Sequence, residues 1–443
     1  MYTIWNNCVQ MPTFDHLTEN ISTDVLVIGG GITGILCAYT LQQAGINTIL
    51  VEAKKICCGV TGYTTAKITA QHGYIFDSLL RRLGPEQTRA YLDSNLDALK
   101  QYQKLSKNID CDFVTQDSFL YAVNNTKLLE DECKALNTIG YTAEMVDTLP
   151  LPLPTAGGLC FQNQAQMNPL KLLSVLANKL KIYEHTQVLE LLPGAARTNH
   201  GTIHSSAIIV ATHFPFINKH GNYFLKLYQQ RSYVLALKNT PVPDGMYIGA
   251  EYPNLSFRTY NGQLLFGGYG HRTGKNTGGW QALMPLSKQL YPDSEIAYHW
   301  ATQDCMTLDG LPYVGQYSKN TPNLYVATGF QKWGMTSAMA AASILRDLLL
   351  NNPNPCIHLF SPSRTILRPQ LFVNGFETAK NLLTFCTPRC SHLGCALKWN
   401  PQEHSWDCPC HGSRFSNDGT VLENPATRNS SSILKMTEKP ESD

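Results

Sequence analysis

Apolar runs and helical periodicity alternate in a regular order near the start of this chain. Residues 24–28 read Asp-Val-Leu-Val-Ile, a short apolar run of the kind that a buried parallel strand needs. Residues 35–44 have helical character and end at Gly45, and a second apolar run follows at 47–51. This order predicts a strand, a helix and a second parallel strand, which is the repeating unit of an α/β fold.

A second group of segments predicts a mixed or antiparallel sheet. Residues 79–105 interleave charged and apolar positions and predict a helix. Asn261-Gly262 is a strong hairpin signal between two strands. The strands predicted in this group are residues 113–123, 231–237, 255–260 and 263–268. A last long helix, at about 336–350, is broken by the proline-containing segment 351–355.

Composition limits the class of protein. A chain of 443 residues is expected to form two or three domains, and 43% hydrophobic residues allow a large core. The net charge of +2 gives no reason to expect nucleic acid or an anionic membrane as a partner. We find no signal peptide at the N-terminus and no apolar run of the roughly 18 residues that a membrane span needs. Most of the fourteen cysteines are scattered and include the adjacent pair Cys57-Cys58, which suits reduced thiols in a cytoplasm.

A glycine motif joins the first strand to the first helix. Gly29-Gly30-Gly31-Ile32-Thr33-Gly34 has the form G-x-G-x-x-G. Such glycines let the backbone approach a pyrophosphate, which then lies at the N-terminus of the helix. Glu52 closes the second strand, where an acidic residue binds a ribose hydroxyl. Together these features predict a dinucleotide site, but the motif does not separate FAD from NAD.

Two boxes near the end of the chain each offer one cysteine and one histidine as metal ligands. They read Cys390-Ser391-His392-Leu393-Gly394-Cys395 and Cys408-Pro409-Cys410-His411-Gly412-Ser413. Two thiolates and two imidazoles are the ligand set of a Rieske-type 2Fe–2S cluster, which transfers single electrons at roughly −150 to +300 mV. The same donors also suit Zn²⁺, although zinc-binding pairs usually have the spacings C-x2-C and H-x3-5-H.

The two boxes resemble those of Rieske proteins. The resemblance implies a disulfide between Cys395 and Cys410 that clamps the two loops, and a hydrogen bond from Ser413 to a bridging sulfur. Cys386 is an additional thiol to which we assign no role. The resemblance assigns the cluster ligands as Cys390, His392, Cys408 and His411.

Three further parts of the chain resemble flavoproteins of the D-amino-acid oxidase superfamily. They are the small-residue loop 59–67, the run 207–212, and the segment from 309 to 336 that resembles the part closing over the flavin. The resemblance covers about residues 20–350 and implies FAD, with the N-terminus of the last long helix pointing at the flavin ring. It places these residues at the cofactor: Gly29, Gly31, Gly34, Glu52, Thr61, Thr65, Val188, Ala211, Gly329, Gly334, Met335 and Thr336.

The expected fold is therefore α/β, with an FAD-binding Rossmann-like domain, a substrate domain built on a mixed β-sheet, and a small C-terminal all-β Rieske module. The flavin domain is discontinuous because its signals lie far apart in the chain. The module is short, so it is expected to lean on the flavoprotein body, with Trp399 and Trp406 as packing residues. The expected domains are 1–80, 155–215 and 305–352 for the flavin, 81–154 and 216–304 for the substrate, a linker at 353–375, and a truncated Rieske domain at 376–443.

The expected activity is oxidation of an amino acid or related amine by hydride transfer to FAD, with electrons passed to the cluster and then to an unknown acceptor. In the resembled family an arginine of the sheet often holds a substrate carboxylate. Arg258 and His271 flank one hairpin and are expected to converge there, and Arg231 and Arg272 are further candidates. Two alternatives stay open: a redox-sensing or electron-relay flavoprotein without amine turnover, and an oxidase with a zinc-stabilised interaction module. We expect a cytoplasmic protein with no nucleic acid partner and no membrane span.

Overall fold

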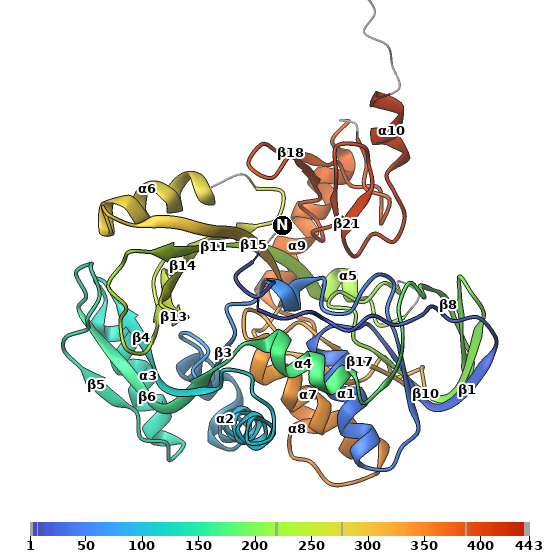
Figure 1. Cartoon of the computed structure of the whole chain (residues 1–443), viewed down its shortest axis with the longest axis horizontal. Helices are drawn as coiled ribbons and strands as arrows, with labels where there is room; N and C mark the ends of the chain where they lie inside the picture. Colours follow the sequence, from blue (N-terminus) through green and yellow to red (C-terminus); the bar gives the residue numbers. More distant parts are fainter. Residues whose placement is uncertain (1–2, 7, 218–219, 276–277, 386–387, 438–443) are drawn as a thin grey trace, which may run out of the picture.

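The chain folds into two large β-sheets with helices packed against them and a small C-terminal sheet (Figure 1). The computed structural model describes residues 3–6, 8–217, 220–275, 278–385 and 388–437. A Rossmann-like sheet, a second mixed sheet and an all-β C-terminal module confirm the fold class predicted from the sequence.

The first sheet is mostly parallel and carries the glycine motif. In the described part of the chain it has eight strands, five of which run parallel in the order β17-β10-β1-β2-β7. Val25 and Val27 of β1 pack into one apolar core, whereas Leu26 and Ile28 pack into another. Because both faces of the strand are buried, the run is apolar throughout instead of alternating. The strand bounds are β1 Ile21–Ile28, β2 Thr48–Val51, β7 Lys181–Tyr183, β8 Val188–Leu192, β9 Ala195–Thr198, β10 Thr202–Val210, β16 Tyr313–Gln316 and β17 Leu324–Thr328.

Three helices cover one face of this sheet: α1 (Ile32–Gln43), α4 (Pro169–Ala177) and α7 (Gly334–Leu349). The buried side of α7 is rich in alanine, including Ala338 and Ala341, and small side chains of this kind let two helices pack closely. The predicted helix at 336–350 is thus confirmed, with its start two residues earlier.

The second sheet has nine strands in the described residues, in the order β15-β11-β14-β13-β12-β4-β6-β3, with β5 beside β6. Asn261 and Gly262 form the turn between β13 and β14 with φ of 47° and 68°, as a two-residue hairpin turn with both residues left-handed requires. The strand bounds are β3 Lys67–Ile68, β4 Val114–Ala122, β5 Glu144–Val146, β6 Gly157–Gln166, β11 Leu227–Lys238, β12 Met246–Gly249, β13 Ser256–Tyr260, β14 Gln263–Arg272 and β15 Glu295–Thr307. The helices around this sheet are α2 Phe76–Ser106, α3 Thr126–Thr138 and α6 Trp280–Leu290.

The C-terminal module, residues 388–437, is a small four-stranded antiparallel sheet with its own apolar cluster. Its strands are β18 Lys398–Asn400, β19 Ser405–Asp407, β20 Arg414–Phe415 and β21 Val421–Glu423, and α10 (Ser431–Thr437) follows. The remaining short elements of the described chain are η1 Val60–Tyr63, α5 Tyr223–Lys226 and α8 Cys356–Leu359, and the longer helix α9 spans Pro369–Leu383. No described helix is long and apolar enough to cross a membrane.

The sheets correct three of the expected domain boundaries. Residues 157–166 form β6, which pairs with β4, so this segment belongs to the second sheet and not to the flavin domain. Lys67–Ile68 also joins the second sheet, as β3. The expected linker at 353–375 contains α8 and the first residues of α9, which begins at Pro369.

Candidate functional site

The glycine motif forms a cradle at the carboxyl ends of β1, β2 and β10. The N–H of Gly29 donates to Val51 O at 2.9 Å, and the N–H of Ala211 donates to Ile28 O at 2.8 Å. Glu52 lies at the end of β2, where its carboxylate accepts the N–H of Gly30 at 2.7 Å. The C-terminal edge of a parallel sheet and the N-terminus of α1 therefore meet at this cradle, which is the arrangement that binds a dinucleotide.

Two glycines of the motif have different roles. A Cβ on Gly34 would lie 1.8 Å from Gly29 O, so this glycine is needed for the turn itself. A Cβ on Gly31 would meet Thr61 Oγ1 at 3.2 Å and, among the described residues, nothing else within 4 Å. The space in front of Gly31 therefore fits a pyrophosphate that approaches the backbone, and the Thr61 hydroxyl accepts the N–H of Ile32 at 2.9 Å beside it.

Other residues expected at the cofactor lie near the carboxyl ends of the same strands. Val188 begins β8, two residues after Thr186, whose N–H donates to Glu52 O at 2.8 Å. Gly329 follows β17, and the neighbouring Thr328 hydroxyl donates to the carbonyl of His213, two residues beyond Ala211. The structure thus brings these widely separated segments together at one edge of the first sheet.

The start of α7 contacts the loop that follows β3. Thr336 Oγ1 lies 3.0 Å from His72 Nε2, and the His72 ring stacks on Trp333 with centroids 4.8 Å apart. Gly334 and Met335 are the first residues of α7, and the carbonyl of Met335 accepts the Tyr102 hydroxyl at 2.8 Å. We did not predict His72 and Trp333 from the sequence, because neither belongs to a recognisable motif.

Two buried cations lie next to the small-residue loop. Arg258 is fully buried, and its guanidinium donates to Gln166 Oε1 at 2.7 Å and to the carbonyl of Thr65. Lys67 Nζ donates to Ser256 Oγ at 2.6 Å, and burial, together with the neighbouring Arg258, lowers its pKa to about 7. The side-chain hydrogen bonds found for Arg258 and Lys67 go to neutral acceptors, so Arg258 contributes a positive charge here, whereas Lys67 is only about half protonated at pH 7.

The two C-terminal boxes fold into loops of the same shape. In the first loop the N–H of Cys390 donates to Cys395 O and the N–H of Gly394 donates to Cys390 O, both at 2.9 Å. In the second loop Cys408 donates to Ser413 O at 2.8 Å and Gly412 donates to Cys408 O at 2.9 Å. The loops face each other, and the rings of His392 and His411 lie 5.0 Å apart at nearly a right angle.

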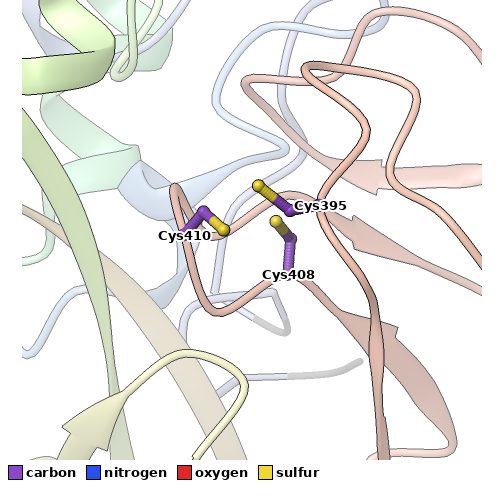
Figure 2. Close-up of side chains that lie close together, drawn as sticks. All are labelled: Cys395, Cys408 and Cys410. Carbon is purple, nitrogen blue, oxygen red and sulfur yellow. The ribbon is translucent and has the colours of Figure 1, made fainter. Parts of the chain in front are cut away.

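Buried sulfur atoms gather between these loops. Figure 2 shows Cys395, Cys408 and Cys410, whose Sγ atoms lie within 4.8 Å of one another. The Cys390 thiol interacts with Cys408, and this contact and burial raise its pKa. Cys395 and Cys410 are free cysteines in this structure, so the disulfide between them stays a proposal. Cys386 lies outside the described residues.

The histidines of the boxes have the protonation state that metal binding needs. Burial lowers the pKa of His392 to about 4 and that of His411 to about 3, so both are neutral at pH 7. His411 Nδ1 is buried without a hydrogen-bond partner among the described residues. A buried polar nitrogen in this position fits a ligand to a metal centre.

Polar side chains of the second sheet hold the second loop against the flavoprotein body. Gln229 Nε2 donates to His411 O at 2.9 Å, and Gln303 Nε2 donates to Gly412 O at 2.8 Å. Arg272 donates to Pro409 O and to Cys410 O, both at 2.9 Å. Gly412 has φ of 87°, and a Cβ there would lie 2.5 Å from Gln229 Cβ, so glycine allows this close approach.

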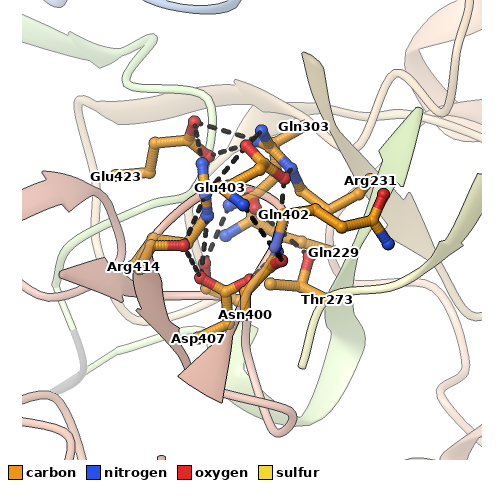
Figure 3. A network of polar contacts seen from close by, with 12 residues as sticks. Gln229, Arg231, Thr273, Gln303, Asn400, Gln402, Glu403, Asp407, Arg414 and Glu423 are labelled. Carbon is orange, nitrogen blue, oxygen red and sulfur yellow. Dashed lines mark hydrogen bonds and ion pairs between the residues drawn. The ribbon is translucent and has the colours of Figure 1, made fainter. Parts of the chain in front are cut away.

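A buried ionic cluster, which we call the docking network, joins the module to β11 (Figure 3). Arg231 pairs with Glu403 and lies 3.0 Å from Glu423, and the side chains of Arg231 and Glu403 are each 1% exposed. Arg414 lies 2.9 Å from both Glu403 and Asp407. Burial opposes ionisation of Asp407, but Arg414 and Arg231 outweigh it and lower its pKa. The members of the docking network are Arg231, Glu403, Asp407, Arg414 and Glu423.

Replacing Arg231 by methionine is expected to destabilise the docked module by about 3 kcal/mol, because Glu403 loses a buried counter-charge. Denaturant unfolding followed at the cluster absorption measures this change. Arg197→Met is the matched control, because its ion pair with Glu190 is about half exposed and is expected to contribute no more than about 1 kcal/mol. Equal unfolding midpoints for both variants would show that the network does not hold the module.

The structure corrects the expected substrate-binding residues. Arg258 and His271 do not converge: Arg258 pairs with Leu265, and His271 lies six residues further along β14, roughly 20 Å away at about 3.3 Å per residue. His271 instead contacts the Tyr233 hydroxyl at 3.0 Å. Arg231 and Arg272 contact the C-terminal module, and the Arg258 guanidinium is occupied by protein acceptors.

The two tryptophans expected as packing residues lie side by side within the C-terminal module. Trp399 and Trp406 face each other across β18 and β19, with ring centroids 5.2 Å apart. The module is held instead by the polar contacts and ion pairs described above. The sequence contains one indication of this polar interface: Gln229-Gln230-Arg231 is a polar run near the start of an interior strand of the sheet.

Comparison with known proteins agrees with both sites, the dinucleotide cradle and the two cysteine–histidine loops. A family model described as FAD dependent oxidoreductase matches residues 24–348, and one described as Rieske [2Fe-2S] domain matches residues 371–437. The Bacillus subtilis (strain 168) protein YhfW, named as a Rieske 2Fe-2S iron-sulfur protein, is 35% identical over 490 residues, covering 96% of each chain. Gamma-glutamylputrescine oxidoreductase of Escherichia coli (strain K12) is 26% identical over 380 residues, covering 76% of this chain and 85% of that one. The solved structure of glycine oxidase from Geobacillus kaustophilus has a TM-score of 0.67 at 20% identity, covering 78% of this chain and 99% of that one, and shows the same fold.

Proposed function

Because this chain belongs to the DAO family of FAD-dependent oxidoreductases and ends in a Rieske [2Fe-2S] domain, we propose that it oxidises the C–N bond of an amine or amino acid and passes the electrons to the cluster. The DAO domain binds FAD and the Rieske domain binds a 2Fe–2S cluster, which sets aside the zinc alternative. The assignment of Cys390, His392, Cys408 and His411 as ligands is part of this proposal. So is a cytoplasmic location, since the described cysteines outside the two boxes are free thiols.

The amine substrate is supported by the names of the relatives. The names of gamma-glutamylputrescine oxidoreductase and glycine oxidase both refer to amino compounds. When bound, FAD accepts a hydride from the carbon next to an amine nitrogen, and the cluster accepts one electron at a time. Arg258 places positive charge beside the loop expected at the flavin, where it would stabilise the negative charge that arrives with the hydride.

The proposed electron transfer from flavin to cluster rests on one observation. The histidine side of the two cluster-binding loops faces the loop that follows β10. The Phe214 ring lies 6.3 Å from the rings of both His392 and His411. Asn424 Nδ2 donates to the carbonyls of Thr212 and Phe214 at 2.5 and 3.1 Å. Since Ala211 borders the dinucleotide cradle, a single short loop links the cradle to the cluster-binding loops. The docking network holds the cluster-binding loops in this position.

The reaction must supply two electrons for every substrate oxidised. Removal of a hydride from carbon and a proton from nitrogen gives an imine, and water then hydrolyses the imine to a carbonyl compound and ammonia, or an amine where the substrate nitrogen carries a second carbon. The two electrons leave one at a time, so the acceptor receives two in total.

Anaerobic rapid mixing of the complete protein with a panel of amines and amino acids tests this function. We expect one class of compound to bleach the flavin absorption first and to reduce the cluster next, as shown by the low average g-value of a reduced Rieske centre in quenched samples. The panel should include glycine, L-proline and gamma-glutamylputrescine.

The matched control is Cys408→Ser, in which flavin reduction should persist while the cluster signal is absent. A cluster that stays oxidised while the flavin turns over would refute the electron path. Failure of every compound to bleach the flavin, combined with reduction of both centres by an artificial donor, would favour the relay without amine turnover.

A further inference from the structure

Helix α9, between the flavoprotein body and the C-terminal module, has its polar side inward and its apolar side outward. Its polar residues recur with the spacing i, i+4, i+7, i+11, which places them on one face of a helix. Its apolar residues recur with the same spacing on the opposite face. The polar set is Gln370, Asn374, Glu377 and Asn381, and the apolar set is Phe372, Phe376, Ala379 and Leu383.

The apolar face of α9 is open to solvent. Phe372 and Phe376 are 73% and 70% exposed, and Leu383 is 74% exposed. Leu367, just before the helix, and Phe385, just after it, extend the same surface at 73% and 99%. Single exposed apolar residues are common, but several large ones together mark an interaction site.

The polar face explains why the helix keeps this orientation. Asn374 Oδ1 accepts from Arg272 Nη1 at 2.9 Å, and Asn381 O accepts the N–H of Ala396 at 3.0 Å. Glu377 lies 2.5 Å from Lys275 Nζ. These contacts anchor α9 to the second sheet and to the first cluster loop, so the apolar face is held outward by the fold.

The charges around this face are basic. Residues 361–390 contain four basic residues, of which Arg364 is paired with Asp309, and a single acidic one, Glu377, which is paired with Lys275. Arg368 precedes the helix, Lys380 lies in its last turn, and Arg389 follows it. The overall net charge of +2 does not reveal this local excess of positive charge. The expectation that an anionic membrane is not a partner was drawn from that net charge and does not apply to this surface.

We propose that the apolar face of α9, together with Leu367 and Phe385, docks this protein on an anionic lipid bilayer surface. Exposed aromatic and aliphatic residues flanked by lysine and arginine are the pattern of a helix that lies in the membrane interface. At 15 residues α9 is about 22 Å long, shorter than the roughly 30 Å of a bilayer core, so it lies in the plane and does not span. A second copy fits less well, because two-fold antiparallel pairing would bring Arg368 of each chain near Lys380 of the other.

Sedimentation of the holoprotein with vesicles tests this docking. Wild type should pellet with vesicles that contain phosphatidylglycerol, and less so at high salt. The affinity of the variant Phe372→Ser/Phe376→Ser for these vesicles should fall by about tenfold or more. Lys380→Gln should weaken binding to phosphatidylglycerol vesicles about fivefold and leave binding to pure phosphatidylcholine vesicles unchanged.

Val114→Ser is the matched control, because Val114 is 48% exposed on β4 and is expected to keep full vesicle binding. FAD and iron content should be normal in every variant, since the changed side chains are exposed. A wild-type protein that stays in the supernatant with both vesicle types would overturn the proposal. The proposal would also be overturned if wild type did not bind vesicles but formed a dimer in sedimentation velocity, and the double phenylalanine variant were monomeric. That result would assign this face to a second copy.

Discussion

Replacement of Cys408 by serine is expected to remove the iron–sulfur cluster and to leave FAD in place. Cys408 is buried at the start of the second loop, close to the sulfur atoms of Cys395 and Cys410. A serine hydroxyl is a poor ligand for an iron that prefers thiolate, so the cluster should not assemble. Iron analysis should fall from about two atoms per chain to nearly none, and the Rieske signal should disappear while the flavin spectrum is retained.

Two comparison variants sharpen this result. Cys133→Ser changes a free, partly buried thiol on α3 and should keep full iron content. Cys395→Ser separates the proposed disulfide from the proposed ligands, because loss of a clamp should lower cluster stability without abolishing assembly. Full iron occupancy in Cys408→Ser would mean that the ligand assignment is wrong.

The parts of the fold that sequence predicted well are those set by local pattern. The apolar run at 24–28 and the glycine motif after it predicted β1 and the start of α1, because a buried parallel strand and a tight turn each leave a local signature. Asn261-Gly262 predicted its hairpin for the same reason, since few residues tolerate left-handed φ. The two boxes predicted that their cysteines and histidines meet, because each loop closes on itself through its own backbone.

The roles of the arginines could not be predicted, because their partners lie far away in the chain. Arg231 pairs with Glu403, which is 172 residues later, and no local pattern connects them. From the sequence, a single arginine in a strand is equally consistent with binding a substrate carboxylate and with an ion pair to another domain. Only the placement of the C-terminal module on β11 decides between the two, and that placement depends on many tertiary contacts together.

The orientation of helix α9 could not be predicted for a different reason. Its apolar spacing is an ordinary amphipathic pattern, and such a pattern normally predicts that the apolar side is buried. Here Asn374 and Asn381 are buried instead, because Arg272 and the first cluster loop supply hydrogen-bond partners for that face. Periodicity shows that a helix has two faces, but it does not show which of them meets the protein.

Replacement of Gly31 by valine is expected to give a folded protein that lacks FAD but keeps its cluster. Gly31 has φ of −78°, which valine can adopt, and its Cβ direction is open except for Thr61 Oγ1 at 3.2 Å. A branched side chain would instead occupy the space of the pyrophosphate at the N-terminus of α1. FAD affinity should fall on the order of 100-fold, so the flavin absorption should be lost while the Rieske signal and the unfolding midpoint of the module are retained.

Two glycine variants separate loss of cofactor from loss of fold. Gly375→Val is the control, since Gly375 lies in α9, outside the segments expected at the cofactor, and a Cβ there meets nothing within 4 Å, so FAD content should stay normal. Gly34→Ala should disrupt the turn itself, because its Cβ would lie 1.8 Å from Gly29 O, and it should therefore lower stability as well as FAD content. Normal FAD content in Gly31→Val would place the cofactor away from the glycine motif. If Gly31→Val lost FAD and cluster together, cofactor binding at the motif would instead be required for folding of the whole chain.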